Sequence, residues 1–283
     1  MKKINLLVAI IISLLLTSCT PTYIKVARQF VNNDNNLAVM VYPTEVEDII
    51  YKYVNTQEIP GYDTMSVDNK LKSEISYSKF LKEISPNIVF DLFVNTYIET
   101  LSKTGLNVYT PEFAEEFNKN SNRTIVKLTQ LQFDEYIEKK TDEALFFDSI
   151  IYYNDVFLNA FAISLWLDMR YPATSDAKIL FASDKITDYH NGEFYYDFYS
   201  REILYEEDNM DMSPADIKYF IKKMAENYAY YTYDYLLTNY VKNNIVEDVD
   251  KLPEDRNLHL DQKTKFVYYY EDPEEWGFIE LNE

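Results

Sequence analysis

Residues that could carry catalysis are scarce in this chain of 283 residues, which contains two histidines and one cysteine. A serine triad needs a histidine base, but His190 precedes the turn-forming pair Asn191-Gly192, and His259 lies in an acidic stretch. We therefore expect a turn position for His190 and a surface or edge-strand position for His259. The lone Cys19 can neither close a disulfide within the chain nor form a structural zinc site by itself.

Clusters of carboxylates are the remaining candidates for chemistry. One cluster comprises Glu206, Glu207, Asp208 and Asp211, and the other comprises Glu271, Asp272, Glu274 and Glu275. Paired carboxylates can hold calcium or hydrolyse glycosides, but in an acidic chain such clusters are usually solvated. The sequence has no calcium-loop spacing with a central glycine, no zinc pattern, no phosphate loop and no dinucleotide fingerprint. We therefore expect a non-enzymatic protein without metal or cofactor, and a carboxylate hydrolase is the least favoured alternative.

The composition of the chain limits the classes of molecule that it can bind. The net charge of −20 repels nucleic acid and anionic lipid headgroups, so we expect no nucleic-acid binding. Apolar residues make up 47% of the chain, which is enough for a folded core. The 27 tyrosines have two readings. They build the core and surface where other proteins use leucine, or they form an adhesive face for a partner or a glycan.

The first residues have the composition of a secretory signal peptide. Lys2 and Lys3 precede an almost wholly apolar stretch, residues 4–16. That stretch is shorter than the roughly 20 residues a membrane-spanning helix needs, and it suits the apolar region of a signal. No later stretch is long and apolar enough, so we expect no transmembrane helix.

The segment Leu16-Thr17-Ser18-Cys19 resembles the bacterial lipobox. The resemblance implies cleavage between Ser18 and Cys19 and acylation of Cys19, which would attach the protein to a lipid bilayer. Residue 20 is threonine, and no acidic cluster follows Cys19. By resemblance to lipoproteins of Bacteroides-like bacteria, this favours the outer membrane with the protein facing the periplasm. Two further triplets resemble the O-glycan acceptor sequence of such bacteria, with Thr64 and Ser149 as the acceptors.

The patterns along the chain predict an α+β domain. We expect a cleaved signal at 1–18, a tether at 19–36, one domain at 37–242 and an acidic extension at 243–283. Helices are predicted from Ser85 to Gly105 and, after a Ser213-Pro214 cap, over 214–241. Strands are predicted over 37–42, 106–109, 124–136 with a bulge near Thr129-Gln130, 156–170, 178–189 and 193–199, the last two joined at Asn191-Gly192. This order predicts a mostly antiparallel sheet of about four to six strands packed by two or three helices, the last of them long.

Three stretches resemble the periplasmic lipoprotein domains of the TolB N-terminal, CsgG and penicillin-binding-protein-activator type. They are residues 124–133, the pair 163–170 and 178–183, and the final helix at 214–241. The chain departs from those families in the turn at residues 172–175, which lacks glycine, and in an insertion of about 40 residues after the first strand. The resemblance implies a protein that assembles with or regulates envelope machinery and carries no common catalytic site.

Two functions therefore stand ahead of the hydrolase. The first is a lipid-anchored accessory or scaffold protein that binds an envelope protein at the outer membrane. The second is a glycan- or ligand-binding lipoprotein that uses tyrosines with Trp166 or Trp276 as stacking platforms.

Overall fold

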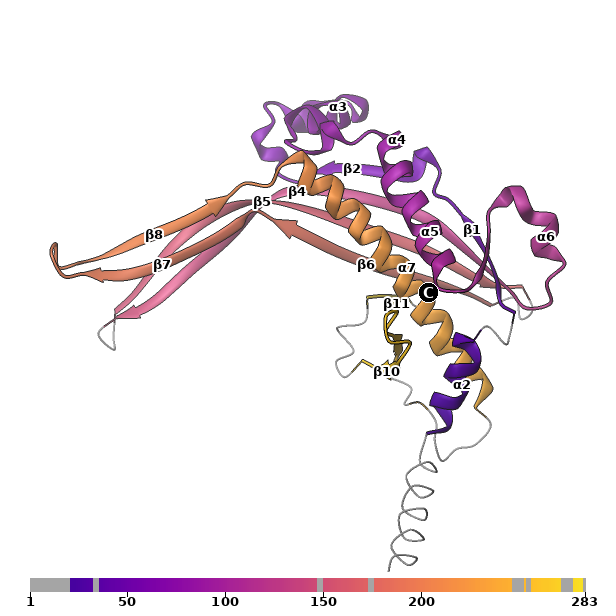
Figure 1. Cartoon of the computed structure of the whole chain (residues 1–283). Helices are drawn as coiled ribbons and strands as arrows, with labels where there is room; N and C mark the ends of the chain where they lie inside the picture. Colours follow the sequence, from indigo (N-terminus) through magenta and orange to yellow (C-terminus); the bar gives the residue numbers. More distant parts are fainter. Residues whose placement is uncertain are drawn as a thin grey trace, which may run out of the picture.

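The computed structural model describes residues 21–32, 36–146, 150–172, 176–245, 252, 256–270 and 277–281. It is a mixed α+β fold in which most helices cover one face of a long-stranded sheet, α6 packs against the other face at β1, and two hairpins project from one end (Figure 1). The α-helices are α2 (Thr22–Val31), α3 (Val67–Tyr77), α4 (Pro86–Val89), α5 (Asn95–Lys103), α6 (Ala114–Asn118) and α7 (Pro214–Asn244). The strands are β1 (Ala38–Tyr42), β2 (Ile49–Tyr53), β3 (Asn107–Tyr109), β4 (Arg123–Phe146), β5 (Ile150–Tyr171), β6 (Asp176–Thr187), β7 (Tyr189–Asp197), β8 (Glu202–Met210), β9 (Leu258–Leu260), β10 (Val267–Tyr269) and β11 (Ile279–Leu281).

The main sheet has seven strands in the order β11-β6-β5-β4-β1-β3, with β2 also paired to β4. The long pairs β4–β5 and β5–β6 are antiparallel, as is β6–β11. The short strands β1, β2 and β3 add parallel pairs. The mostly antiparallel sheet is confirmed. Its seven strands exceed the expected four to six because short β2 and β11 join the long strands.

Capping residues set the ends of the helices where the sequence predicts them. The Ser213 hydroxyl accepts from the Asp216 N–H at 3.3 Å, and the Asp216 carboxylate accepts from the Ser213 N–H at 2.8 Å, which closes a capping box on α7. Ser85 caps α4 with Pro86 in its first turn. Gly105, at φ 97°, follows α5 in the left-handed conformation. These predictions are confirmed.

The predicted helix from Ser85 to Gly105 is interrupted. It begins as α4, passes through a π-helical turn at Phe90–Val94 (η5) and continues as α5. Short 3₁₀ turns lie at Val46–Asp48, Thr56–Glu58, Tyr62–Thr64, Leu81–Glu83 and Pro111–Phe113. The register shift between Leu128 and Gln130 confirms the predicted bulge in β4.

The hydrophobic core lies between the sheet and the helices α4, η5, α5 and α7. Alternate residues of β4 and β5 face it, including Phe133, Phe161 and Leu165. Tyr228 is a buried residue of α7, and its hydroxyl donates to the Ile163 carbonyl of β5 at 2.9 Å. Helix α7 therefore binds the sheet both by apolar burial and by a hydrogen bond that satisfies a buried phenol.

The core extends beyond the predicted domain at 37–242. Residues 22–31, expected to be part of a tether, form α2, which buries Phe30 against Tyr233 of α7 with ring centroids 5.4 Å apart. Residues after 243 also contribute, because Leu258 and Phe278 are buried in the same cluster. The predicted tether at 19–36 and the predicted separate extension at 243–283 are therefore wrong for these residues. Both segments bury apolar side chains, and the local sequence does not show which residues those side chains pack against.

The predicted hairpin at Asn191-Gly192 is wrong. Both residues lie inside the continuous strand β7, and the turn follows it at residues 198–201. There the Asp197 carboxylate accepts from the Tyr199 and Ser200 N–H groups, and Arg201 takes a positive φ of 64°. An Asx-type turn thus outcompetes the Asn-Gly pair. No helix among the described residues has both the length and the apolar character needed to cross a membrane.

Candidate functional site

The most distinctive feature of the molecule is a projecting arm, which we define as residues 138–146, 150–158 and 189–210. It consists of the whole hairpin β7–β8 together with the ends of β4 and β5 that lie next to the connection between these two strands (Figure 1). In this region neither β2 nor β6 continues to flank β4 and β5, because β2 pairs only as far as Glu135 and β6 only as far as Ala160. The arm is therefore two short layers that leave the main sheet.

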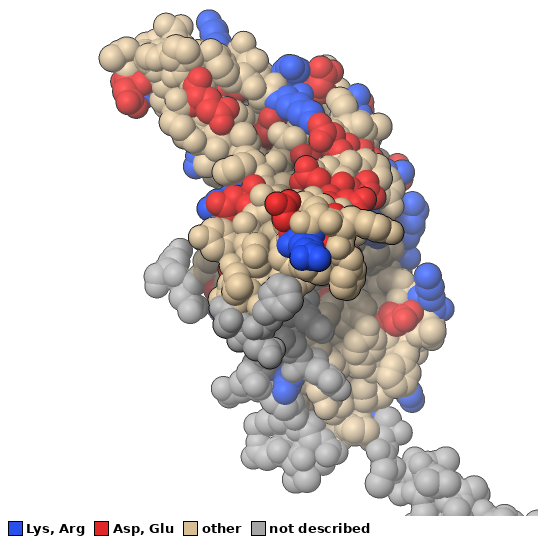
Figure 2. Space-filling model, turned by 90° about the vertical axis from the view of Figure 1, so that its left-hand side faces the viewer, with Lys and Arg blue, Asp and Glu red and all other residues tan. Residues whose placement is uncertain are grey.

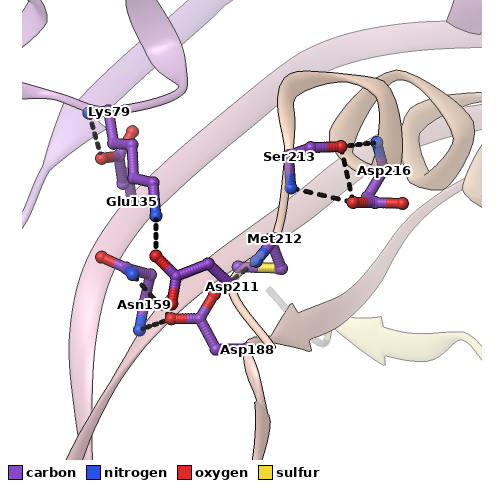
Figure 3. A network of polar contacts seen from close by, with 8 residues as sticks. All are labelled: Lys79, Glu135, Asn159, Asp188, Asp211, Met212, Ser213 and Asp216. Atoms are coloured by element: carbon purple, nitrogen blue, oxygen red, sulfur yellow. Dashed lines mark hydrogen bonds and ion pairs between the residues drawn. The ribbon is translucent and has the colours of Figure 1, made fainter. Parts of the chain in front are cut away.

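Two buried carboxylates fix the base of the arm (Figure 3). The Asp188 carboxylate lies between β6 and β7 and accepts from the Asn159 N–H at 2.9 Å, the Asn159 amide at 2.6 Å and the Met212 N–H at 2.7 Å. The Glu135 carboxylate accepts from the N–H groups of Lys79, Phe80 and Leu81 at 2.5–3.1 Å. Each carboxylate thus ties backbone groups from other segments to the point where the strands diverge.

A histidine cluster holds the two layers of the arm together. The Asp142 carboxylate of β4 contacts the His190 Nε2 of β7 at 2.5 Å and accepts from the Tyr205 hydroxyl of β8 at 2.6 Å. The His190 Nδ1 lies 2.5 Å from the Asn209 side-chain oxygen. A Cβ at Gly192 would overlap both the Tyr205 hydroxyl and the Asp142 carboxylate. Gly192 therefore permits close approach of the layers and does not serve a turn.

Hydrogen bonds within the cluster shift the pKa values of Asp142 and His190. Hydrogen bonds from Tyr205 and then His190 lower the pKa of Asp142 to about 2. Hydrogen bonds with Asn209 and then Asp142 raise the pKa of His190. The predicted turn position of His190 is wrong, since its side chain is only 1% exposed within this cluster.

The outer face of the β4–β5 layer is uncovered and carries exposed apolar side chains, with Asp155 between Tyr153 and Phe157 on the same face. Leu145, Ile151, Tyr153 and Phe157 are 60–73% exposed. They share the sheet face that α7 covers in the body, where Phe161 packs edge-on against Phe220 at 6.5 Å. Phe157 has the same parity along β5 as Phe161 but lies beyond the start of the covering helix. The same alternation therefore makes core in the body and an exposed apolar stripe on the arm.

Acidic residues surround this stripe. The described arm residues include ten Asp or Glu and three Lys or Arg, which makes the arm markedly negative. Acidic side chains are prominent on the side of the molecule that carries the arm (Figure 2). The cluster Glu206, Glu207 and Asp208 lies on exposed β8. Among the described residues, no group of three or more His, Cys, Asp or Glu side chains is arranged to hold a metal ion.

Ser18, Cys19, Ser149 and Trp276, together with the acidic residues at 271–275, lie outside the described residues. Thr64 is exposed in a 3₁₀ turn, and its hydroxyl donates to the Gly61 carbonyl at 2.8 Å. Trp166 is partly buried on the opposite face of the sheet from α7 and packs on Phe181 with ring centroids 4.8 Å apart.

The second histidine also pairs with a carboxylate. His259 lies in the short strand β9, and its Nδ1 is 2.6 Å from the Asp234 carboxylate and 3.0 Å from the Tyr270 hydroxyl. Burial raises the pKa of Asp234. Burial also acts to lower the pKa of His259, but the hydrogen bond and charge of Asp234, with the charge of Asp261, outweigh it and raise that pKa. In the described part of the chain no serine, threonine or cysteine is hydrogen-bonded to either imidazole, so neither cluster includes a nucleophile in position for triad chemistry.

A cavity of about 390 Å³ lies where β5, β6 and β11 meet, on the same side of β5 as Trp166. Asp168, Arg170, Lys178 and Glu280 contribute charges of both signs to its lining. One Asp168 oxygen accepts from Arg170 at 2.6 Å, while the other is buried without a hydrogen-bond partner. That second oxygen is closed off from solvent, so the charged groups that face the cavity are the Arg170, Lys178 and Glu280 side chains and the Asp168 oxygen paired with Arg170.

Comparisons with known proteins leave the family open. No protein-family model matches the chain, and no curated protein matches it. A solved structure described as a homologue of neuraminyllactose-binding hemagglutinin from Helicobacter pylori is similar over 74% of this chain and 91% of its own length. The identity is 12% and the TM-score 0.30, values too low to carry an argument about function.

Only part of this site was predictable. Sequence periodicity continues through Ile151, Tyr153 and Phe157, and that alternation could have extended the predicted strand into the arm. Nothing in the local sequence distinguishes a stripe under a helix from one that the helix does not reach.

Proposed function

We propose that this protein is a non-enzymatic, lipid-anchored envelope protein that binds a protein partner through its arm. The observation that carries the proposal is the exposed continuation of the core face along Leu145, Ile151, Tyr153 and Phe157. Clustered exposed apolar side chains among polar ones are typical of protein-binding surfaces. Acylation of Cys19 and a position at the outer membrane facing the periplasm belong to the same proposal and rest on the lipobox resemblance.

The size of the stripe predicts a modest intrinsic affinity. Fully burying one such side chain stabilises by about 1.5–3 kcal/mol, and association costs at least about 4 kcal/mol of lost rigid-body freedom. The four side chains alone therefore support a weak complex. A lipid anchor would raise the local concentration of a membrane-bound partner, which compensates for weak intrinsic binding.

A photo-crosslinking amino acid placed at Tyr153 in cells tests the arm. We expect one discrete crosslinked partner, and we expect Phe157→Glu to abolish the crosslink by placing a charge in the interface. The matched control is the same crosslinker at Val67, which is 83% exposed on α3, away from the arm. Equal labelling from both positions, or labelling that is indifferent to Phe157→Glu, would refute the arm as the binding surface.

The anchor is tested separately. Cys19→Ala should abolish incorporation of labelled palmitate and release the protein from the membrane fraction. A variant that still carries lipid would contradict the lipobox assignment and leave the arm proposal intact.

Ligand binding on the opposite face of the sheet is the second candidate. The charged side chains that line the cavity and the nearby Trp166–Phe181 pair favour a ligand with hydroxyl groups and an apolar face, such as a glycan. Calorimetric titration with a panel of mono- and disaccharides should give binding that Asp168→Ala and Trp166→Ala both weaken. Absence of binding across the panel would reject glycans as ligands of this face.

A further inference from the structure

Strand β5 has a free edge along the whole arm. In the body β5 pairs with β6 from Tyr171 to Ala160, and the last contact is the Asp188 N–H donating to the Asn159 carbonyl at 2.9 Å. Beyond that point, residues 150–158 pair only with β4. Among the described residues no strand takes the place of β6 there, because β7 pairs only with β8.

The backbone groups on this edge can be identified from the ladder. Both the N–H and the carbonyl of Asn159 point to the β6 side, where Asp188 binds them. In an antiparallel strand alternate residues direct their backbone groups to the same side. The N–H and carbonyl groups of Phe157, Asp155, Tyr153 and Ile151 therefore point to the free edge. The opposite strand agrees with this alternation. Ile137 pairs with Asn159 across the β4–β5 ladder, and its N–H points away from β5 and donates to the Asn55 side chain.

The other edge of the same layer is protected by charge. The residues of β4 whose backbone groups face outward include Lys139 and Glu143, opposite Phe157 and Tyr153. Charged side chains on an edge strand discourage the addition of another strand. The β5 edge has Asp155 as its one charged residue and no lysine, proline or glycine. Ile151, Tyr153 and Phe157 instead combine outward backbone groups with exposed apolar side chains.

We infer that the β5 edge of the arm binds an extended segment of a partner as an added β-strand, and that this segment alternates apolar with basic residues. The inference rests on the proposed function and names the partner's chemistry at the same surface. Main-chain hydrogen bonds supply affinity in this mode of recognition, and alternate side chains supply specificity. The apolar set of the added strand continues the stripe of Ile151, Tyr153 and Phe157.

The negative charge of the arm favours a basic partner strand over a second copy of this chain at the β5 edge. A second copy of this chain would bring another arm with the same excess of acidic residues to the edge, and the whole chain carries a net charge of −20. Like charges brought together at an interface oppose association, whereas basic residues on the incoming strand are attracted. The edge is thus matched to a basic partner strand and mismatched to self-pairing.

The test uses a defined probe, a blocked, fluorescent nine-residue peptide that alternates lysine and valine, with binding measured by fluorescence anisotropy. We expect saturable binding to the full chain, and at least tenfold weaker binding of the matched peptide that alternates glutamate and valine. A third peptide, N-methylated at alternate residues so that one side of its backbone cannot donate, should also bind at least tenfold more weakly. These comparisons use the unaltered protein and do not depend on the folding of any variant.

Proline substitution tests the edge from the protein side. Asp155→Pro removes an N–H that faces the free edge and lies outside the β4–β5 ladder, so the arm is expected to keep its pairing. Asp155→Ala removes the same carboxylate but retains the N–H. Glu143→Pro makes the equivalent change on the β4 edge. We expect Asp155→Pro to bind the lysine peptide at least tenfold more weakly than Asp155→Ala, and Glu143→Pro to bind within about twofold of the wild type.

Each result bears on the inference. Absence of binding by the lysine peptide, or binding that N-methylation leaves unchanged, overturns it. Self-association in analytical ultracentrifugation that Asp155→Pro abolishes assigns the edge to a second copy and overturns the basic partner. If the crosslink from Tyr153 depends on Phe157 while the peptides fail, the arm binds its partner through the stripe alone, so the proposed function survives and the strand addition does not.

Discussion

Asp188 provides the sharpest prediction, because one carboxylate holds the base of the arm. Its side chain accepts three hydrogen bonds, from two donors of Asn159 and from the Met212 N–H, and Asp188 is only 6% exposed. The conservative variant Asp188→Asn keeps the shape but replaces one acceptor oxygen with a donor. In its better orientation the amide oxygen still accepts from Asn159, and the amide nitrogen then faces the Met212 N–H.

The magnitude follows from those contacts. A hydrogen bond to a charged group contributes about 1.5–3 kcal/mol and a neutral one about 0.5–1.5 kcal/mol, so the two retained bonds each weaken by about 1 kcal/mol. The Met212 N–H is left buried without an acceptor, which costs about 1–3 kcal/mol. We therefore expect Asp188→Asn to lower the free energy of unfolding by about 3–5 kcal/mol, and the melting temperature by roughly 10 °C for a chain of this size.

Urea denaturation followed by circular dichroism measures this loss. Asp208→Asn is the matched control, because Asp208 lies exposed on β8 and its substitution is expected to change stability by less than about 0.5 kcal/mol. Amide exchange should show the added loss of protection at the base of the arm, where Asn159 and Met212 donate. If Asp188→Asn unfolds with the same free energy as Asp208→Asn, the carboxylate does not hold the arm and the reasoning fails.

Two further predictions concern the contact between the layers of the arm. The pKa of His190 is raised by folding, so the stability it contributes is present below its unfolded pKa near 6.5 and is lost as the pH rises through its folded pKa. The pKa of Asp142 is lowered to about 2, so the stability it contributes is present above its ordinary pKa of 3.8 and is lost as the pH falls through about 2. Exchange-derived opening energies in the arm should therefore be larger at pH 5.5 than at pH 8.5, and a difference that persists in His190→Gln would contradict the assignment. Gly192→Ala should separate the layers, because its methyl group would overlap the Tyr205 hydroxyl; the expected result is loss of amide protection in the arm with the body unchanged, and full protection in this variant would disprove the close contact.

The local features of the fold were predictable because their causes are local. The capping box of Ser213 and Asp216 and the left-handed Gly105 depend on residues within one helical turn. The strands β4 and β5 follow from the local alternation of apolar residues, of which Phe161 and Leu165 face the core. The class of fold followed from these elements and their order.

The failed predictions share a physical reason. Asn191-Gly192 has the composition of a turn, but Gly192 is required by Asp142, a residue 50 positions earlier in the chain. The assignment of His190 to a turn failed with it. Helix α2 and the strands β9 and β11 were missed because their partners are residues of α7 and β6. In each case the deciding contact is distant in sequence.

The sequence by itself determined the acidic character, the scarcity of catalytic residues, the helix caps and the strand alternation, since each depends on composition or on neighbours along the chain. Tertiary structure decided where that alternation is covered. Helix α7 packs over Phe161 and begins too far from Phe157 to reach it, so two residues of one apolar stripe have opposite fates. The arm, its free edge and its apolar face all follow from that limit, because burial depends on what lies opposite a side chain and not on the side chain alone.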